Sequence, residues 1–142
     1  MKTTDAMTVP RPATLQDVAA RTLAGEPFDF LLRESLDDFY GADVEARATA
    51  IRIAPASVGA IHDAYLAAVA EHLALRFGSA VPSWTDDPDR FLAEPFFAGG
   101  LETLKAVLLV ESPLAFRRRQ IFVSANALSR ASEHAASAQS AH

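Results

Sequence analysis

The spacing of apolar positions along the chain predicts a protein built almost entirely of helices. Apolar residues recur every three or four positions, the spacing that gathers them on one face of a helix. Thr14 opens the first such stretch with Asp17 three residues later, a capping-box arrangement, and Gly25 closes it. The apolar stripe of this helix comprises Leu15, Val18, Ala19 and Leu23.

Two further helices follow. The second is predicted from Phe28 to Tyr40, with Gly41 just beyond its end. Asp43 can cap a third, shorter helix that runs through Ile53 and is ended by Pro55. The apolar stripe of the second helix comprises Phe28, Leu32, Leu36, Phe39 and Tyr40.

The fourth predicted helix is the best defined of the set. It is expected to start at Ser57 and to stop at Gly78, and its many alanines favour helix. The residues expected on its buried face are Ile61, Tyr65, Val69, His72 or Leu73, and Phe77.

The chain changes character between residues 81 and 100, which read VPSWTDDPDRFLAEPFFAGG. A short helical piece is expected over residues 87–93, with Pro88 at its first helical position. Large apolar side chains in such a segment do not remain in water. The segment is therefore predicted to be a packed connector, through Trp84, Phe91, Leu92, Phe96 and Phe97.

The last part of the chain adds helices on either side of Pro113. Residues 101–110 are apolar nearly all round, which favours a central buried helix, with a short strand as the alternative. Ser112 and Pro113 start a short helix, and Ser124 caps a final one whose Ala/Ser-rich end is expected to fray. We therefore expect one all-α bundle of seven or eight helices over residues 14–131, a flexible leader over 1–13 and an extension over 132–142.

Composition supports a single globular domain. Half of the 142 residues are apolar and 22% are charged. The chain has no cysteine, which excludes disulfides, thiolate zinc sites and thiol nucleophiles and suits a reducing compartment. No apolar run reaches the length of a signal peptide or a membrane span, so we expect a cytoplasmic protein without membrane association.

Charge is distributed unevenly along the chain. The net charge is −5, but residues 1–111 carry 9 basic and 17 acidic side chains, whereas residues 112–142 carry 4 basic and 1 acidic. The densest positive charge is the triplet Arg117, Arg118 and Arg119, which lies between Phe116 and the apolar pair Ile121-Phe122. These anchors predict that the arginines sit on a rigid element.

The triplet can be interpreted in three ways. The arginines can pair with acids of the same domain, such as Asp86, Asp87 and Glu111, because charge runs are commonly paired internally or solvated. They can bind carboxylates of a partner protein, or they can contact nucleic-acid phosphates, which the acidic body disfavours. Successive helical residues point about 100° apart, so at most two of the three can face one partner.

No catalytic, cofactor or metal site is predicted. His62 and His72 lie ten positions apart on one helix, too far apart to share a metal, and His72 is expected at the edge of the core. The acids of TDDPD lack the other ligands of a calcium loop, so helix capping by Asp87 is the preferred interpretation. The glycines of FFAGG are not followed by the Lys or Ser/Thr of a phosphate loop.

Residues 82–131 contain a series of short motifs: Pro82-x-Trp84, Asp87-Pro88-x-Arg90-Phe91, Phe97 to Leu101, Glu111-Ser112-Pro113, Ala115 to Arg119 and Ile121-Phe122. On these motifs the segment resembles the C-terminal module of a largely uncharacterised all-helical bacterial family. It also resembles the C-terminal part of helix-turn-helix proteins that are antitoxin-like components encoded beside nucleotidyltransferase-like toxins. The resemblance implies a protein partner but assigns no functional residues, and residues 1–27 leave no room for a helix-turn-helix.

The leading functional hypothesis is a non-enzymatic interaction module, antitoxin-like, that occludes a partner protein. Its expected partner-binding residues are Arg117, Arg118, Arg119, Trp84 and Phe97. The alternatives are a regulator that contacts nucleic acid through Arg117–Arg119 and a small enzyme of unknown class. A homo-oligomer is compatible with all three hypotheses.

Overall fold

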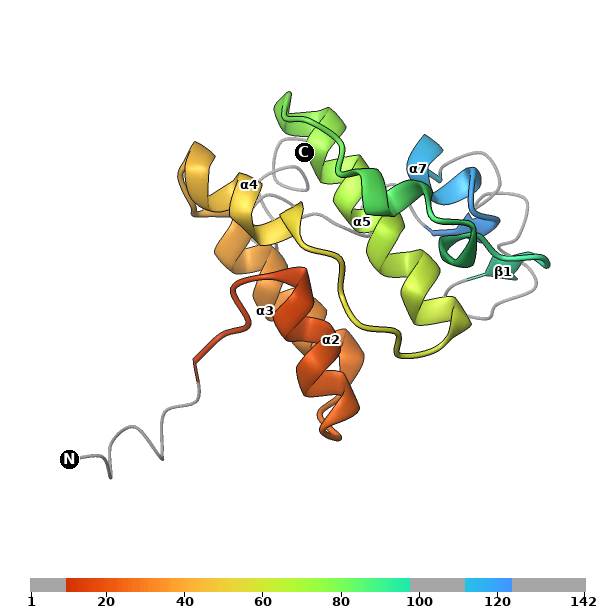
Figure 1. Cartoon of the computed structure of the whole chain (residues 1–142), viewed down its shortest axis with the longest axis horizontal. Helices are drawn as coiled ribbons and strands as arrows, with labels where there is room; N and C mark the ends of the chain where they lie inside the picture. Colours follow the sequence, from red (N-terminus) through yellow and green to blue (C-terminus); the bar gives the residue numbers. More distant parts are fainter. Residues whose placement is uncertain (1–9, 98–111, 124–142) are drawn as a thin grey trace, which may run out of the picture.

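The computed structural model describes residues 10–97 and 112–123, and within these ranges the protein is mostly helical (Figure 1). The described part holds five α-helices, not the expected seven or eight; the helices predicted at 101–110 and from Ser124 onward lie outside it. None of the described helices is long and apolar enough to span a membrane. The elements are α2 (Leu15–Leu23), α3 (Phe28–Tyr40), α4 (Val44–Arg52), α5 (Ala60–Phe77), the 3₁₀ helices η1 (Ser83–Asp86) and η2 (Pro88–Arg90), β1 (Phe96–Phe97), α7 (Leu114–Arg117) and β2 (Ile121–Phe122).

The predicted caps set the limits of the first three helices. The Thr14 hydroxyl accepts a hydrogen bond from the Asp17 N–H at 3.0 Å, and the Asp17 carboxylate accepts one from the Thr14 N–H at 3.3 Å, so the capping box is confirmed. Asp43 caps α4 by accepting from the Ala46 N–H at 2.8 Å. All five residues of the α3 stripe are buried, whereas Leu23 on α2 is 60% exposed, against expectation.

The start of α5 differs from the prediction. The helix begins at Ala60 after Gly59, whose φ of 131° few other residues adopt, and not at Ser57. Ser57 instead belongs to the preceding turn, where its hydroxyl donates to the Asp63 carboxylate at 2.6 Å. The other Asp63 oxygen accepts from the Val58 N–H at 2.8 Å, so Asp63 fixes the turn from inside the helix. The predicted end is confirmed, because Gly78 adopts a left-handed conformation there.

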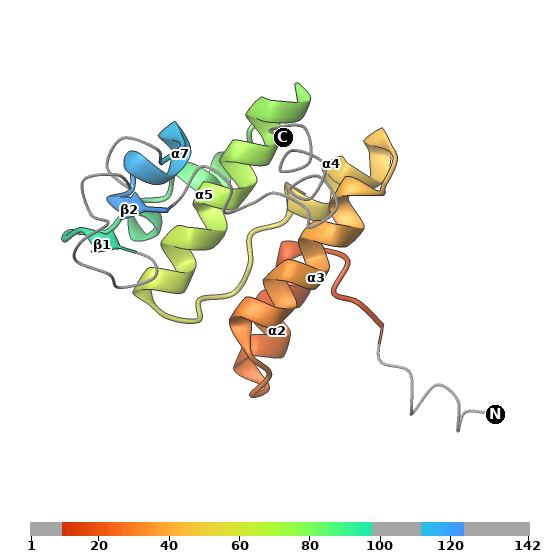
Figure 2. The same cartoon turned by 180° about the vertical axis from the view of Figure 1, so that it is seen from behind.

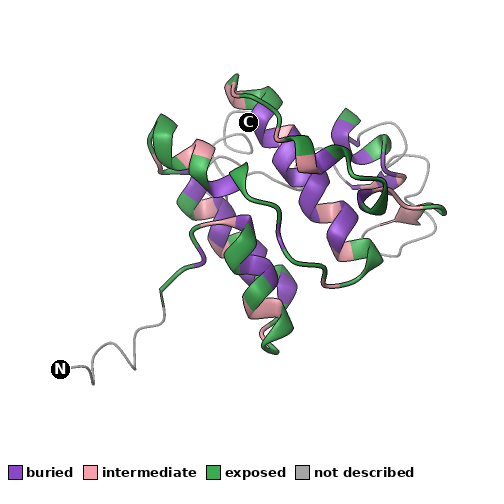
Figure 3. Ribbon diagram, viewed as in Figure 1, coloured by how far each residue is buried: buried purple, intermediate pink, exposed green. Residues whose placement is uncertain are grey.

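Helix α5 is the centre of the described fold. Helices α2, α3 and α4 lie along one side of it, and η1, η2 and α7 pack against the other, as two opposite views show (Figures 1 and 2). Of its expected buried face, Val69 and Leu73 are buried and Tyr65 and Phe77 pack against the core, whereas Ile61 is 40% exposed. The helix is also buried on most of its circumference (Figure 3), because small alanines allow neighbours to approach on both sides.

Aromatic rings join α5 to α3. Phe28 stacks on His62 with ring centroids 4.0 Å apart, and the Phe77 ring lies 5.5 Å from Phe39 and 5.8 Å from Tyr40. These contacts lie near the two ends of both helices. They hold the three N-terminal helices against the central one.

The connector packs as expected, but its conformation is more extended than predicted. In place of the helical piece expected over residues 87–93 stands the 3₁₀ turn Pro88–Arg90, with Pro88 at its start, and a further 3₁₀ turn, η1, precedes it. The five apolar side chains expected to pack are all half-buried. Phe96 and Phe97 then pair in parallel with Ile121 and Phe122, a contact that the sequence pattern did not predict.

Candidate functional site

Helix α7 and the turn after it position the arginine triplet. Pro113 precedes the helix, Arg118 and Arg119 follow its last turn, and Gln120 adopts a left-handed conformation with φ of 63°. The Gln120 side chain donates to the carbonyls of Leu92 and Ala93 at 3.0 and 3.1 Å, which ties this turn to the connector. Phe116 and Ile121, on either side, are fully buried. The predicted anchoring of the triplet is therefore present.

Arg119 points into the core. Its side chain is 0% exposed, and its guanidinium donates to the Glu71 carboxylate at 2.6 Å. It also donates to the carbonyls of Ala115 at 2.8 Å and Thr85 at 2.6 Å, and it lies 4.5 Å from the centre of the Phe91 ring. Arg119 therefore joins α5, η1 and α7 and is not available to a partner, which removes it from the expected binding surface.

Arg118 occupies an intermediate position. Its guanidinium contacts the second Glu71 oxygen at 3.3 Å and the Asp86 carboxylate at 3.4 Å. The side chain is 41% exposed, and the Asp86 side chain is 72% exposed. The pair with Asp86 is both exposed and long, so it is weak and Arg118 can exchange this partner at low cost.

Arg117 is exposed and forms no ion pair within the described ranges. Leu114 precedes it by one helical turn and is 59% exposed. Residues three and four apart on a helix share a face, so Leu114, Arg117 and Arg118 can meet the same partner. We call these three residues the α7 ridge.

The internal-pairing interpretation therefore applies to one arginine fully and to another in part. Asp86 was an expected partner and binds Arg118, but Asp87 caps η2 by accepting from the Asp89 N–H at 3.2 Å. Glu111 lies outside the described residues. The main partner, Glu71, was missed, although a carboxylate among the alanines and leucines of α5 was a signal that it needed a buried cation.

Trp84 and Phe97, the other two expected partner-binding residues, make internal contacts. The Trp84 indole donates to the Ile51 carbonyl at 3.0 Å and so ties η1 to the end of α4. Phe97 stacks on Phe122, with ring centroids 5.0 Å apart. Both side chains are half-buried, so only part of each is left for a partner.

Sequence reasoning also missed a second buried arginine, Arg90. It donates to the Pro55 carbonyl at 2.7 Å, lies 3.9 Å from the Asp63 carboxylate and sits 4.9 Å from the Trp84 ring. Asp63 on α5 thus accepts hydrogen bonds from the turn before the helix and lies next to Arg90 of the connector after it. Arg90 and Arg119 are buried cations that hold the connector on α5.

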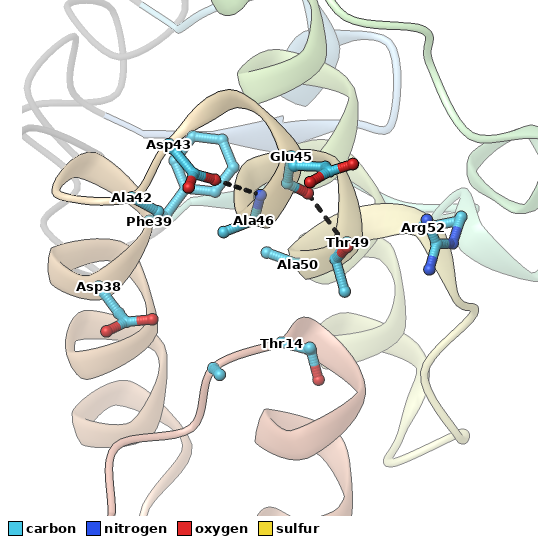
Figure 4. Close-up of a pocket in the computed structure, with 11 residues that line it drawn as sticks. Thr14, Asp38, Phe39, Ala42, Asp43, Glu45, Ala46, Thr49, Ala50 and Arg52 are labelled. Carbon is cyan, nitrogen blue, oxygen red and sulfur yellow. Dashed lines mark hydrogen bonds between the residues drawn. The ribbon is translucent and has the colours of Figure 1, made fainter.

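A pocket of about 650 Å³ lies between the start of α2, the end of α3 and α4 (Figure 4). Its apolar lining includes Phe39, Ala46 and Ala50, and its charged lining is Asp38, Asp43 and Glu45 against Arg52. Asp43 is engaged in capping α4, whereas the carboxylates of Asp38 and Glu45 have no ion pair within the described ranges. We call this feature the acidic pocket.

Burial shifts the pKa of one histidine and one tyrosine on α5. Burial lowers the pKa of His72 from its usual 6.5, with a further contribution from the Arg76 charge, and the ring lies edge-on to Phe116. Burial raises the pKa of Tyr65 to about 12, aided by Asp29, so its hydroxyl stays protonated at neutral pH. Among residues 10–97 and 112–123, no three His, Cys, Asp or Glu side chains are grouped so as to hold a metal ion.

Comparison with known proteins gives no assignment for this geometry. No protein-family model matches the chain, and no curated protein or solved structure is significantly similar to it.

Proposed function

We propose that this protein is a non-enzymatic interaction module whose α7 ridge binds an acidic and partly apolar surface of a partner protein. The observation that carries the proposal is the environment of Arg117. This arginine is exposed, has no internal counter-ion in the described part, and lies beside the exposed Leu114 on a turn fixed by the buried Arg119. Because the backbone that carries Arg117 is already fixed, binding restricts the side chain alone, which favours recognition.

A protein carboxylate suits this ridge better than a nucleic-acid phosphate. Binding to a duplex depends on neutralising several phosphates at once, and the ridge offers only Arg117 and part of Arg118. The connector carries exposed acids at Asp86, Asp87 and Asp89, of which Asp86 contacts Arg118 of the ridge, and these acids would repel a polyanion. A single partner carboxylate beside an apolar contact matches the ridge without this penalty.

The resemblance of residues 82–131 to antitoxin-like modules supports the kind of partner. In that setting the ridge would cover an acidic cleft of a nucleotidyltransferase-like protein and so block it. Occlusion requires a fixed surface and no catalytic group. The fully buried Arg119–Glu71 pair provides the fixed mounting.

The proposal is tested by affinity capture followed by a binding measurement on the captured protein. We expect Arg117→Glu to weaken binding to that partner by at least about tenfold, because it replaces an attraction with a repulsion in one contact. Arg33→Glu is the matched control, since Arg33 is an exposed arginine on α3 and its reversal changes the net charge equally.

Equal affinities of the wild type and Arg117→Glu would overturn the proposal. A salt titration separates the nucleic-acid alternative. Binding of a DNA or RNA oligonucleotide that weakens steeply with salt and is lost in Arg117→Glu would favour that alternative instead.

A further inference from the structure

The acidic pocket and the α7 ridge have opposite charges and matching apolar parts. The pocket presents the Asp38 and Glu45 carboxylates around a lining that includes Phe39 and Ala50 (Figure 4). The ridge presents Arg117 and Arg118 beside Leu114, which is 59% exposed. The charges of the two surfaces are therefore complementary, and both surfaces include apolar groups.

The two surfaces cannot meet within one molecule. The pocket lies among α2, α3 and α4, whereas α7 packs on the far side of the central helix α5, and both views agree on this separation (Figures 1 and 2). Contact between them therefore requires two copies. Because the ridge and the pocket lie on opposite sides of α5, two molecules make one ridge–pocket contact, and the contact is head-to-tail.

We propose that the α7 ridge of one copy docks into the acidic pocket of a second copy. Leu114 enters the apolar part of the pocket, and Arg117 pairs with the Asp38 or Glu45 carboxylate of the other molecule. Arg118 follows by exchanging its long contact with Asp86 for a pocket carboxylate. The head-to-tail contact leaves one ridge and one pocket free at the ends, so it can add further copies.

The association is weak and salt-sensitive. Exposed ion pairs contribute little individually, and the ridge is short, so we expect a dissociation constant on the order of 0.1 to 1 mM. Salt screens such pairs and reduces the association further. The same Arg117 is used in the proposed function, so partner binding and self-association compete, although the self-association itself does not depend on any partner.

Sedimentation velocity tests the proposal, with two variants that each remove one surface. Leu114→Ser/Arg117→Ser removes the ridge and keeps the pocket; Asp38→Asn/Glu45→Gln removes the charge of the pocket and keeps the ridge. We expect the wild type to form dimers and higher species as its concentration rises at low salt. Each variant alone should associate at least about tenfold more weakly.

Mixing the two variants is the decisive measurement. One intact pocket and one intact ridge then remain for each pair of molecules, so the mixture should form dimers but no longer species. All of these residues are exposed, so circular dichroism should show both variants folded. A wild type that stays monomeric up to millimolar concentration at low salt would overturn the proposal, as would a mixture that fails to dimerise; neither result bears on the partner-binding role of Arg117.

Discussion

Three consecutive arginines occupy three different environments in this protein. Side chains that follow one another along a helical turn diverge by about 100°, so neighbours in sequence need not share surroundings. Arg119 is fully buried and forms an ion pair with Glu71. Arg118 is half-exposed and contacts Glu71 and Asp86, and Arg117 is exposed. The function of the triplet is therefore divided between mounting the turn and presenting charge.

Replacing each arginine separately should show this division. Arg119→Ala should lower the free energy of unfolding by about 3–5 kcal/mol, because it leaves Glu71 buried without its main partner. Arg117→Ala should change it by less than about 0.5 kcal/mol, since the side chain is exposed. Urea denaturation followed by circular dichroism measures both.

A second comparison checks that the loss comes from an uncompensated charge. The double variant Glu71→Leu/Arg119→Leu should lose less stability than Arg119→Ala. It removes both buried charges together, so neither is left without a partner. Equal effects of Arg117→Ala and Arg119→Ala would contradict the assignment of Arg119 to the core.

The environment of His72 makes stability depend on pH. Its pKa in the folded protein lies below the usual 6.5, so between these two values the unfolded chain binds more protons than the folded one. The contribution of His72 is thus fully retained above pH 6.5 and is lost as the pH falls toward its folded pKa. We expect the urea midpoint of the wild type to decrease between pH 7 and pH 5 by more than that of His72→Gln.

The same comparison also isolates His72 from the other histidines, which are present in both proteins. A proton titration followed by NMR should place the pKa of His72 below 6.5. A value at or above 6.5 would contradict the burial that the structure gives this ring.

At the level of elements, several helix caps are recognisable from the sequence, whereas the role of Asp63 at the start of α5 is not. Thr14, Asp43 and Gly78 act at the ends of their helices, as their sequence positions indicate. Asp63 instead acts from the first turn of α5, where it accepts from Ser57 and from the Val58 N–H. Carboxylates are favourable in the first turn of a helix because of the exposed N–H groups and the helix dipole.

Asp63 should accordingly be more important to stability than an ordinary first-turn acid. Asp63→Ala removes two hydrogen bonds and the nearest carboxylate to the buried Arg90, so we expect a loss of about 2–4 kcal/mol. Asp29→Ala, at the exposed first turn of α3, is the control and should cost less than about 1 kcal/mol. Thermal or urea unfolding distinguishes them, and similar losses would show that the turn and Arg90 do not rely on Asp63.

At the scale of the molecule, α5 joins two groups of elements by different means. Toward α3 the contacts are largely aromatic, through His62, Tyr65 and Phe77, whereas toward the connector and α7 they include the two buried ion pairs of Glu71 and Asp63. A buried ion pair stabilises a fold only where its geometry is good. The side that holds these ion pairs is the one that carries the α7 ridge.

Phe77 tests the aromatic side. Its ring contacts Phe39 and Tyr40 and lies 4.3 Å from the Arg47 guanidinium, which donates to the carbonyls at the end of α3. Phe77→Ala should lower the free energy of unfolding by about 2–4 kcal/mol through the cavity and the lost cation–π contact. Phe77→Leu should recover more than half of this loss, and an alanine variant as stable as the wild type would show that α3 and α5 are held together elsewhere.

The amino-acid sequence by itself determined the mostly helical class, the ends of most described helices and the anchoring of the arginine triplet. These features depend on residues within about four positions of one another, such as Thr14 with Asp17 or Pro113 with the turn that follows. Only the tertiary structure decided that Arg119 binds Glu71, 48 positions earlier, that Ser57 serves Asp63 rather than starting a helix, and that Phe96 pairs with Ile121. The reason is physical: a cap is satisfied by the local chain, whereas the partner of a buried charge or an unpaired strand is whichever group the packed core brings within reach.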